Sequence, residues 1–271
     1  MGVFNVYFLY KQSMKTYKIT VAYDGTNYYG WQVQPSDTTV AQVLQTKFTQ
    51  TFNHPITLLG ASRTDTGVHA LGQVARVRTS LGISPSQIIT AWNSALPKDI
   101  HIRSLDPIDD NFNPCSNVFE KTYWYNLFLK PPLPFIARYG WLYPFIHRVD
   151  FAKFEDILQI YLGTHDFASF CKKDGERTTI RTINSISLKK LSRWNMAQVE
   201  IKGPSFLRFQ IRRMIGYALD IAQQPKVPID YIKRMLDNPN PQQTLVKADG
   251  SGLCLRKVIY VNELNNQQRT I

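Results

Sequence analysis

The chain has 271 residues, of which 44% are hydrophobic, so it can bury a substantial core as one large domain or two smaller ones. It contains no apolar run near the ~20 residues that a transmembrane helix needs, and its first residues lack the features of a secretory signal. Lys and Arg number 32 against 20 Asp and Glu, a formal charge of +12. The positive electrostatic field of such a chain favours encounters with polyanions. A basic protein without a polyanionic partner is an equally valid interpretation of the charge alone.

The three cysteines, Cys115, Cys171 and Cys254, lie far apart in the sequence and form no C-x-x-C pair. This spacing indicates neither a disulfide framework nor a zinc site. It is typical of a protein kept in a reducing compartment, and we therefore expect a cytoplasmic location.

The N-terminal part begins with residues 1–14, an extension before the patterned chain for which disorder is one interpretation. Lys18 to Tyr23 reads as a strand that ends at an Asp-Gly turn. Thr39 to Phe52 has the spacing of an amphipathic helix, and Gln73 to Val77 alternates like a strand.

The C-terminal part contains the strongest strand signal, from Tyr123 to Leu129. Its apolar residues fall on both faces of the strand, which predicts a central, covered position in a sheet. Phe151 to Tyr161 and Phe206 to Ala222 read as helices, and the second has an apolar stripe at steps of three and four. The stretch that starts at Asn238 reads as a loop because it contains two prolines and two asparagines.

The mixture of strand-like and helix-like segments predicts an α+β fold. A weakly marked boundary near residues 105–115 divides the chain into two strand-and-helix halves of comparable size. We place the N-terminal half at residues 15–108 and the C-terminal half at residues 109–271.

Several common catalytic motifs are absent from the sequence. It has no G-x-x-x-x-G-K-[ST] or G-x-G-x-x-G loop for phosphates, and no G-x-S-x-G elbow. The five histidines are scattered, and neither H-E-x-x-H nor the zinc deaminase signature is present. We therefore expect no metal and no nucleotide or other cofactor.

One carboxylate stands out in the string LGASRTDTGVHALGQVARV, which runs from Leu59 to Val77. Asp65 follows Arg63-Thr64 and precedes Thr66-Gly67. One interpretation is a tight turn in which the Asp65 side chain accepts backbone N–H bonds and glycine supplies a positive φ. The other interpretation is a catalytic carboxylate.

The surrounding motifs favour the second interpretation, because in chain order they resemble those of the tRNA pseudouridine synthase A (TruA) family. The matching segments are YDGTNYYGWQVQ (23–34), ASRTDTGVHA (61–70), NSALPKDI (93–100), KTYWY (121–125), GTHDFASF (163–170), FLRFQIRRMIG (206–216) and GLCL (252–255). The resemblance extends from about residue 17 to 260. The departures, such as Gln210 where methionine is frequent, do not touch the chemistry that the resemblance implies.

The resemblance implies a fold in which two similar halves form a continuous antiparallel sheet, flanked by helices, with a basic central cleft. It also implies a homodimer that isomerises uridine to pseudouridine at positions 38, 39 and 40 of the tRNA anticodon arm, without a cofactor. Two rival functions are a non-catalytic RNA-binding module of the same fold and a nucleosidase that releases free uracil.

The resemblance assigns four site residues, each of which also has a structural explanation. Asp65 is the implied nucleophile, and Arg212 pairs with it, although Arg212 also fits a solvated helix position. Tyr123 is the implied substrate-binding platform or, alternatively, a core aromatic residue. Arg63 is the implied occupant of the stack that the target base leaves, or a partner in a surface salt bridge. We interpret His69 as scaffolding of the motif.

Overall fold

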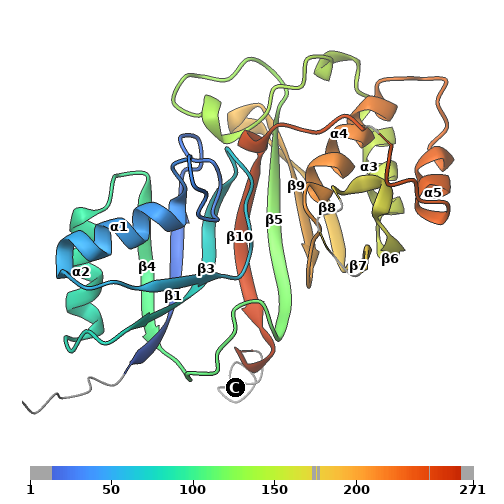
Figure 1. The fold of residues 1–271 in the computed structure, drawn as a ribbon. Coiled ribbons are helices and arrows are strands. Elements are labelled where there is room, and N and C mark those ends of the chain that lie inside the picture. Colours follow the sequence, from blue (N-terminus) through green and yellow to red (C-terminus); the bar gives the residue numbers. More distant parts are fainter. Residues whose placement is uncertain (1–13, 173–174, 176–177, 244, 264–271) are drawn as a thin grey trace, which may run out of the picture.

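The computed structural model describes residues 14–172, 175, 178–243 and 245–263. The predicted N-terminal extension, residues 1–14, therefore lies outside the described residues except for Met14. The remaining elements form a sheet with helices packed beside it (Figure 1).

The main sheet has eight strands within the described ranges, in the order β4-β1-β3-β10-β5-β9-β8, with β2 also paired to β3. These strands are β1 (Lys15–Tyr23), β2 (Thr57–Gly60), β3 (His69–Thr79), β4 (Ile100–Pro107), β5 (Val118–Phe128), β8 (Ser185–Leu191), β9 (Met196–Gly203) and β10 (Leu253–Tyr260). A separate antiparallel pair joins β6 (Gly163–Asp166) to β7 (Ile180–Ile183).

The sheet is mixed, so the expectation of an antiparallel sheet throughout is wrong at one junction. β3 and β10 run parallel, with Cys254 opposite His69 and Leu255 opposite Ala70. A tight hairpin forces its two strands to be antiparallel, but these strands belong to distant segments, so no short connection fixes their direction. The α+β class and the helices beside the sheet are as expected.

Two groups of helices accompany the sheet (Figure 1): α1 and α2 lie beside the N-terminal strands, and α3, α4 and α5 lie beside the C-terminal strands. The helices are α1 (Val40–Phe52), α2 (Pro85–Ala95), α3 (Phe151–Ile160), α4 (Gln210–Ala222) and α5 (Asp230–Asp237). None of them combines the length and apolar character needed to cross a bilayer.

The N-terminal core includes β1, whose side chains alternate between buried and half-buried from Tyr17 to Tyr23. Its buried face lies against α1 and α2, where Phe48 and Trp92 are fully buried and their ring centroids are 4.8 Å apart. The Trp92 indole N–H donates to the backbone oxygen of Leu44, so its polar atom is satisfied inside the core.

The central strand β5 lies between β10 and β9, as the sequence predicts. Tyr125 and Leu127 on one face are fully buried. On the opposite face Phe128 is fully buried, but Trp124 and Asn126 are only half-buried and line a pocket, so the prediction that both faces are covered is wrong for this part of the second face. Strand period alone cannot tell a covered apolar face from one that borders a pocket.

The helix predicted from Phe206 to Ala222 begins only at Gln210. Phe209, directly before it, has φ 65° and ψ 0°, the left-handed conformation, which a right-handed helix cannot include. The Gln210 side chain accepts a hydrogen bond from the backbone N–H of Leu207 at 2.8 Å and so closes the turn before the helix. Apolar spacing continues through this turn although the helical backbone does not.

Candidate active site

The loop that contains Asp65 lies where β3 changes its neighbour in the sheet from β10 to β2. β2 pairs with β3 at residues 75–78, whereas β10 pairs with it at His69 and Ala70. Residues 61–68 connect β2 to β3 at this division. The loop therefore lies at the boundary between the N-terminal strands and the C-terminal strands of the sheet.

Two buried polar side chains hold the first part of the loop. The Lys121 ammonium donates to the backbone oxygen of Ala61 at 2.7 Å, and the Gln73 amide donates to that of Ser62 at 2.6 Å. Burial lowers the pKa of Lys121. Both side chains reach the loop from strands, so the positions of these carbonyl groups are set by the sheet.

The segment before α1 holds the middle of the loop. The backbone oxygen of Thr64 accepts from the N–H of Trp31 at 3.1 Å, and the Thr64 hydroxyl lies 2.8 Å from the hydroxyl of Tyr23. Gly30 has φ +88°, and a Cβ at this position would lie 2.4 Å from the Thr64 oxygen. Glycine is required here both by the backbone conformation and by the close approach.

The end of the loop is a tight turn, but the Asp65 carboxylate is not what closes it. Val68 N–H donates to the backbone oxygen of Asp65 at 3.1 Å, and Gly67 has φ +74°. Within the described ranges, the Asp65 carboxylate accepts a hydrogen bond from Arg212. The turn therefore leaves the side chain for another role.

Arg212 and Asp65 form an ion pair, with Arg212 Nη1 3.0 Å from Asp65 Oδ2. Their side chains are only 10% and 18% exposed, respectively. Arg212 Nε also donates to the backbone oxygen of Ala248 at 2.9 Å, so the guanidinium is held on two sides. A charge-assisted contact of this kind fixes both the position and the direction of the carboxylate.

Tyr123 lies in the same site, on the face of β5 that is directed toward α4. Its hydroxyl donates to Ser62 Oγ at 3.3 Å, and its ring meets Phe206 edge to face with centroids 5.2 Å apart. Burial raises the pKa of Tyr123 to about 12, and the negative charge of Asp65 acts in the same direction. The phenol therefore stays neutral at ordinary pH.

Arg63 lies at the edge of the site, whereas His69 lines a separate pocket that is described below. Arg63 is exposed, next to the buried Thr64. His69 Nδ1 accepts from the backbone N–H of Gly25 at 3.0 Å, and its Nε2 lies 2.9 Å from the backbone oxygen of Arg138. Burial lowers the pKa of His69, so the ring is neutral and joins two loops.

Lys121 and Gln73 are the positioning side chains that the sequence reasoning missed. Lys121 belongs to the motif KTYWY, and Gln73 belongs to the string around Asp65. The available signal was a long polar side chain within a strand that is otherwise apolar, which requires a buried partner. No group of three or more His, Cys, Asp or Glu residues able to hold a metal occurs within the described ranges.

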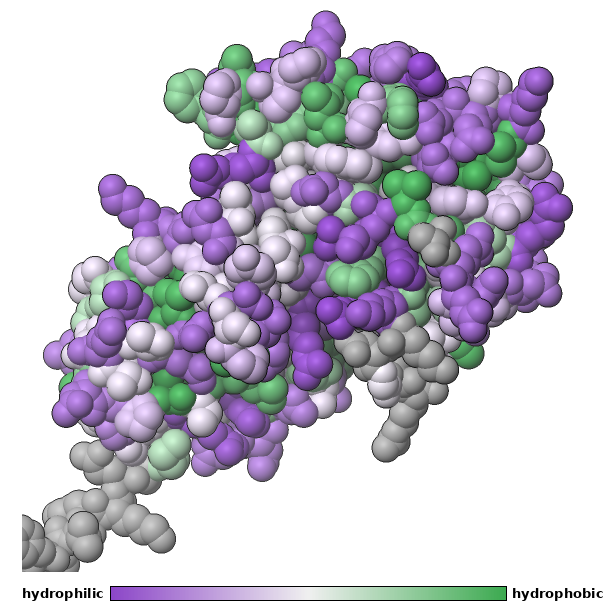
Figure 2. Space-filling model, turned by 45° about the horizontal axis from the view of Figure 1, so that its top comes forward, coloured by the Kyte–Doolittle hydropathy of each residue, from purple (hydrophilic) through white to green (hydrophobic). Residues whose placement is uncertain are grey.

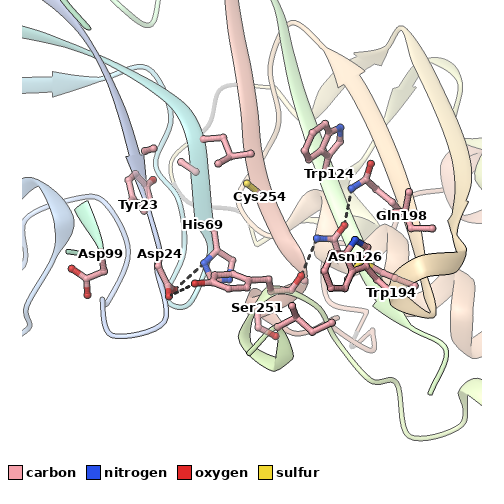
Figure 3. Close-up of a pocket in the computed structure, with 18 of the residues that line it drawn as sticks. Tyr23, Asp24, His69, Asp99, Trp124, Asn126, Trp194, Gln198, Ser251 and Cys254 are labelled. Carbon is pink, nitrogen blue, oxygen red and sulfur yellow. Dashed lines mark hydrogen bonds and ion pairs between the residues drawn. The ribbon is translucent and has the colours of Figure 1, made fainter. Parts of the chain in front are cut away.

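A separate pocket of about 670 Å³ lies on the other face of the sheet. Trp124 and Gln198 lie on one side of it, and Asp24 and His69 lie on the other (Figure 3). Alternate residues of a strand point to opposite faces, so Trp124 faces away from its neighbour Tyr123 and from the Asp65 site. This pocket is therefore distinct from the ion-paired carboxylate.

These observations define a class of site: a rigidly held, ion-paired carboxylate beside a buried tyrosine in a strongly basic chain. The comparisons identify the family. The family model described as tRNA pseudouridine synthase matches residues 19–115 and 157–261, which include Asp65, Arg63 and Arg212. The chain belongs to the tRNA pseudouridine synthase family.

Curated relatives resemble this chain over most of its length. A protein of Thermodesulfovibrio yellowstonii, "tRNA pseudouridine synthase A", is 34% identical over 257 residues. The alignment covers 91% of this chain and 100% of the relative. "tRNA pseudouridine synthase A 2" of Clostridium perfringens is 31% identical, with 91% of this chain and 100% of the relative covered. "tRNA pseudouridine synthase A" of Exiguobacterium sibiricum is 35% identical, with 91% and 97% covered.

Replacing Gly30 by alanine tests how tightly the loop is held. We expect Gly30→Ala to lower the free energy of unfolding by about 2–4 kcal/mol, because it combines a left-handed backbone with a steric clash. Gly82→Ala is the matched control, since a Cβ there meets no atom within 4 Å. Urea unfolding measures both variants, and equal stabilities would contradict the proposed constraint.

Removing the cation from the ion pair should strand the carboxylate. A fully buried pair would lose about 3–5 kcal/mol, but the partial exposure of both groups reduces the expected loss for Arg212→Met to about 2–3 kcal/mol. Adding Asp65→Asn to Arg212→Met should recover part of this loss, because no charge is then left unpaired. Strictly additive unfolding energies in this double-mutant cycle would rule out the coupling.

Proposed function

We propose that this protein isomerises uridine to pseudouridine at positions 38, 39 and 40 of the tRNA anticodon arm, with Asp65 as the nucleophile. The observation that carries the proposal is the Asp65 carboxylate held by Arg212 at 3.0 Å, in a loop within the segment that matches the family. The relatives named tRNA pseudouridine synthase A support the reaction and the class of substrate.

The chemistry requires an oriented carboxylate. The reaction breaks a C–N glycosidic bond, turns the uracil and forms a C–C bond to the same sugar, without net oxidation or an energy source. Glycosidases use carboxylates at a comparable oxocarbenium-like centre. The 18% exposure of the Asp65 side chain leaves it reachable by a substrate while Arg212 keeps it aimed.

The target uridine must leave its stack before it can reach Asp65. Unstacking costs a few kcal/mol, and an aromatic contact returns about 1–3 kcal/mol per base. We assign this contact to Tyr123, whose ring forms a wall of the site at 8% exposure. We assign the vacated place in the stack to Arg63, which is exposed and has a planar guanidinium.

A basic central cleft is the proposed RNA-binding surface. Hydrophilic residues gather across the middle of the face in Figure 2, between the two lobes. Lys247 lies close enough to Arg208, Arg212, Arg213 and Asp65 to interact with their charges. Together with the overall charge of +12, they would attract the phosphates of an anticodon arm.

The proposed halves, residues 15–108 and 109–271, have the same strand order. The first half is ordered β4-β1-β3-β2 and the second β10-β5-β9-β8. In each half one helix follows the first strand and another precedes the last strand. These helices are α1 and α2 in the first half, and α3 and α4 in the second. This is the βαββαβ arrangement of ferredoxin-like units, which supports two similar halves.

We further propose a cytoplasmic homodimer that buries the second face of the sheet. The pocket of about 670 Å³ on this face is lined by Leu71, Tyr139 and Trp194, which are 40%, 40% and 44% exposed. Exposed apolar side chains that gather around one pocket are typical of an interaction surface. A second copy would cover them without blocking the Asp65 site.

The reaction is tested by incubating the protein with unmodified tRNA and separating the digested nucleosides by chromatography. We expect pseudouridine with the unaltered protein, and a rate lowered by more than about 10³-fold with Asp65→Ala. Asp106→Ala, which removes an exposed carboxylate on β4, is the control. Unchanged uridine would favour the RNA-binding module, and lost uracil would favour the nucleosidase.

The assembly is tested by light scattering coupled to gel filtration. We expect twice the chain mass of 31.2 kDa for the unaltered protein and a monomer for Trp194→Asp, because a carboxylate there opposes apolar contact. Ile180→Asp changes a 54% exposed residue of β7 that does not line the pocket, and it should remain dimeric. A monomeric unaltered protein would refute the dimer.

A further inference from the structure

Phe209 has an unusual backbone for an aromatic residue. Among the described residues, the non-glycine residues with positive φ are three asparagines and Phe209. Asparagine tolerates the left-handed region, whereas a bulky side chain is strained there. Such strain is retained where the surrounding structure enforces it, often at functional sites.

Three cations surround the Phe209 ring. Lys247 Nζ lies 4.3 Å from the ring centroid. The guanidinium carbons of Arg208 and Arg212 lie at 5.0 Å and 5.6 Å. Each is within the range of a cation–π interaction, and the electron-rich ring offsets the repulsion among the positive charges. The left-handed turn thus places one aromatic ring where three cations converge.

The ring is directly connected to the reacting carboxylate. Arg212, which contacts Phe209, is the residue whose Nη1 lies 3.0 Å from Asp65 Oδ2. Its Nε donates to Ala248, the residue that follows Lys247. A displacement of the Phe209 ring would therefore disturb both the aim of Arg212 and the position of Lys247.

Positive charge is in excess at this point. Lys247, Arg212 and Arg213 are cationic here, and the nearby carboxylates are those of Asp65 and Asp249, so cations outnumber carboxylates even without Arg208. Burial, followed by the charge of Arg212, lowers the pKa of Lys247. An anion placed beside Lys247 would relieve this repulsion, and RNA offers a phosphate on either side of each nucleotide.

We propose that Phe209 is a positioning residue that directs Arg212 toward Asp65 and, with Lys247 and Arg208, forms a binding site for a phosphate next to the reacting uridine. This inference rests on the proposed pseudouridine synthase activity, because the RNA supplies the phosphate. Arg212 pairs with the Asp65 carboxylate, and Lys247 and Arg208 bind the phosphate. The ring between them couples the placement of the RNA backbone to the geometry of the reaction.

The test compares kcat and KM for an unmodified tRNA transcript, and the salt dependence of its binding in the Asp65→Asn background. Phe209→Leu should lower kcat about tenfold and weaken binding about threefold, because Arg212 and the phosphate-binding cations lose the ring. Phe209→Tyr, which keeps the ring, should restore both values. Lys247→Met should raise KM more than it lowers kcat and reduce the salt slope by about 0.7–0.9, the value for one phosphate contact.

A second variant separates positioning from folding. Phe209→Asn fits the left-handed backbone, so it should be more stable than Phe209→Leu, which keeps the strain, and still lose kcat as Phe209→Leu does. Tyr231→Leu on α5, which removes a ring 5.6 Å from the Arg234 guanidinium carbon, is the matched control and should change neither kcat nor the salt slope.

The outcomes distinguish this inference from the proposed function. If the unaltered protein makes no pseudouridine, the proposed function fails, while the salt slopes still decide the phosphate site. If it is active and both Phe209→Leu and Phe209→Asn match Tyr231→Leu in kcat, the positioning role is refuted. An unchanged salt slope for Lys247→Met refutes the phosphate contact.

Discussion

The ion pair between Asp65 and Arg212 joins residues 147 positions apart in the chain, and the site depends on it. Asp65 lies in a loop between the N-terminal strands β2 and β3, whereas Arg212 lies in the first turn of α4 in the C-terminal part. The site therefore exists only when both parts are folded against each other. Hydrogen bonds from Lys121 and Gln73 hold the loop that contains Asp65, and the backbone oxygen of Ala248 holds the Arg212 guanidinium.

Much of this arrangement could be predicted from the sequence because its signals are local. Period-two alternation located β1 and β5, and the ordered motifs led to the family and to Asp65, whose contact with Arg212 the structure shows. The start of α4 was predicted too early, since apolar spacing does not reveal that Phe209 turns left-handed. Short strands such as β2 and β6, four residues each, contain too few residues for a clear period.

Other features depend on contacts between distant segments and have no local signal. The parallel pairing of β3 with β10 is decided by how the two parts pack, so it could not be read from either strand. The convergence of Arg208, Arg212 and Lys247 on one ring depends on a loop that returns from α5. A charged residue in such a loop resembles any solvated surface position until its neighbours are known.

The narrow junction between β3 and β10 has a mechanical consequence. Only two residue pairs are in register there, whereas β5 and β9 share eight. Bending the molecule at this seam would break fewer main-chain hydrogen bonds than bending it elsewhere along the sheet. The Asp65–Arg212 ion pair and the hydrogen bond from Lys121 to Ala61 both cross this seam, so side-chain contacts of the site itself add to the few main-chain hydrogen bonds that join the two parts.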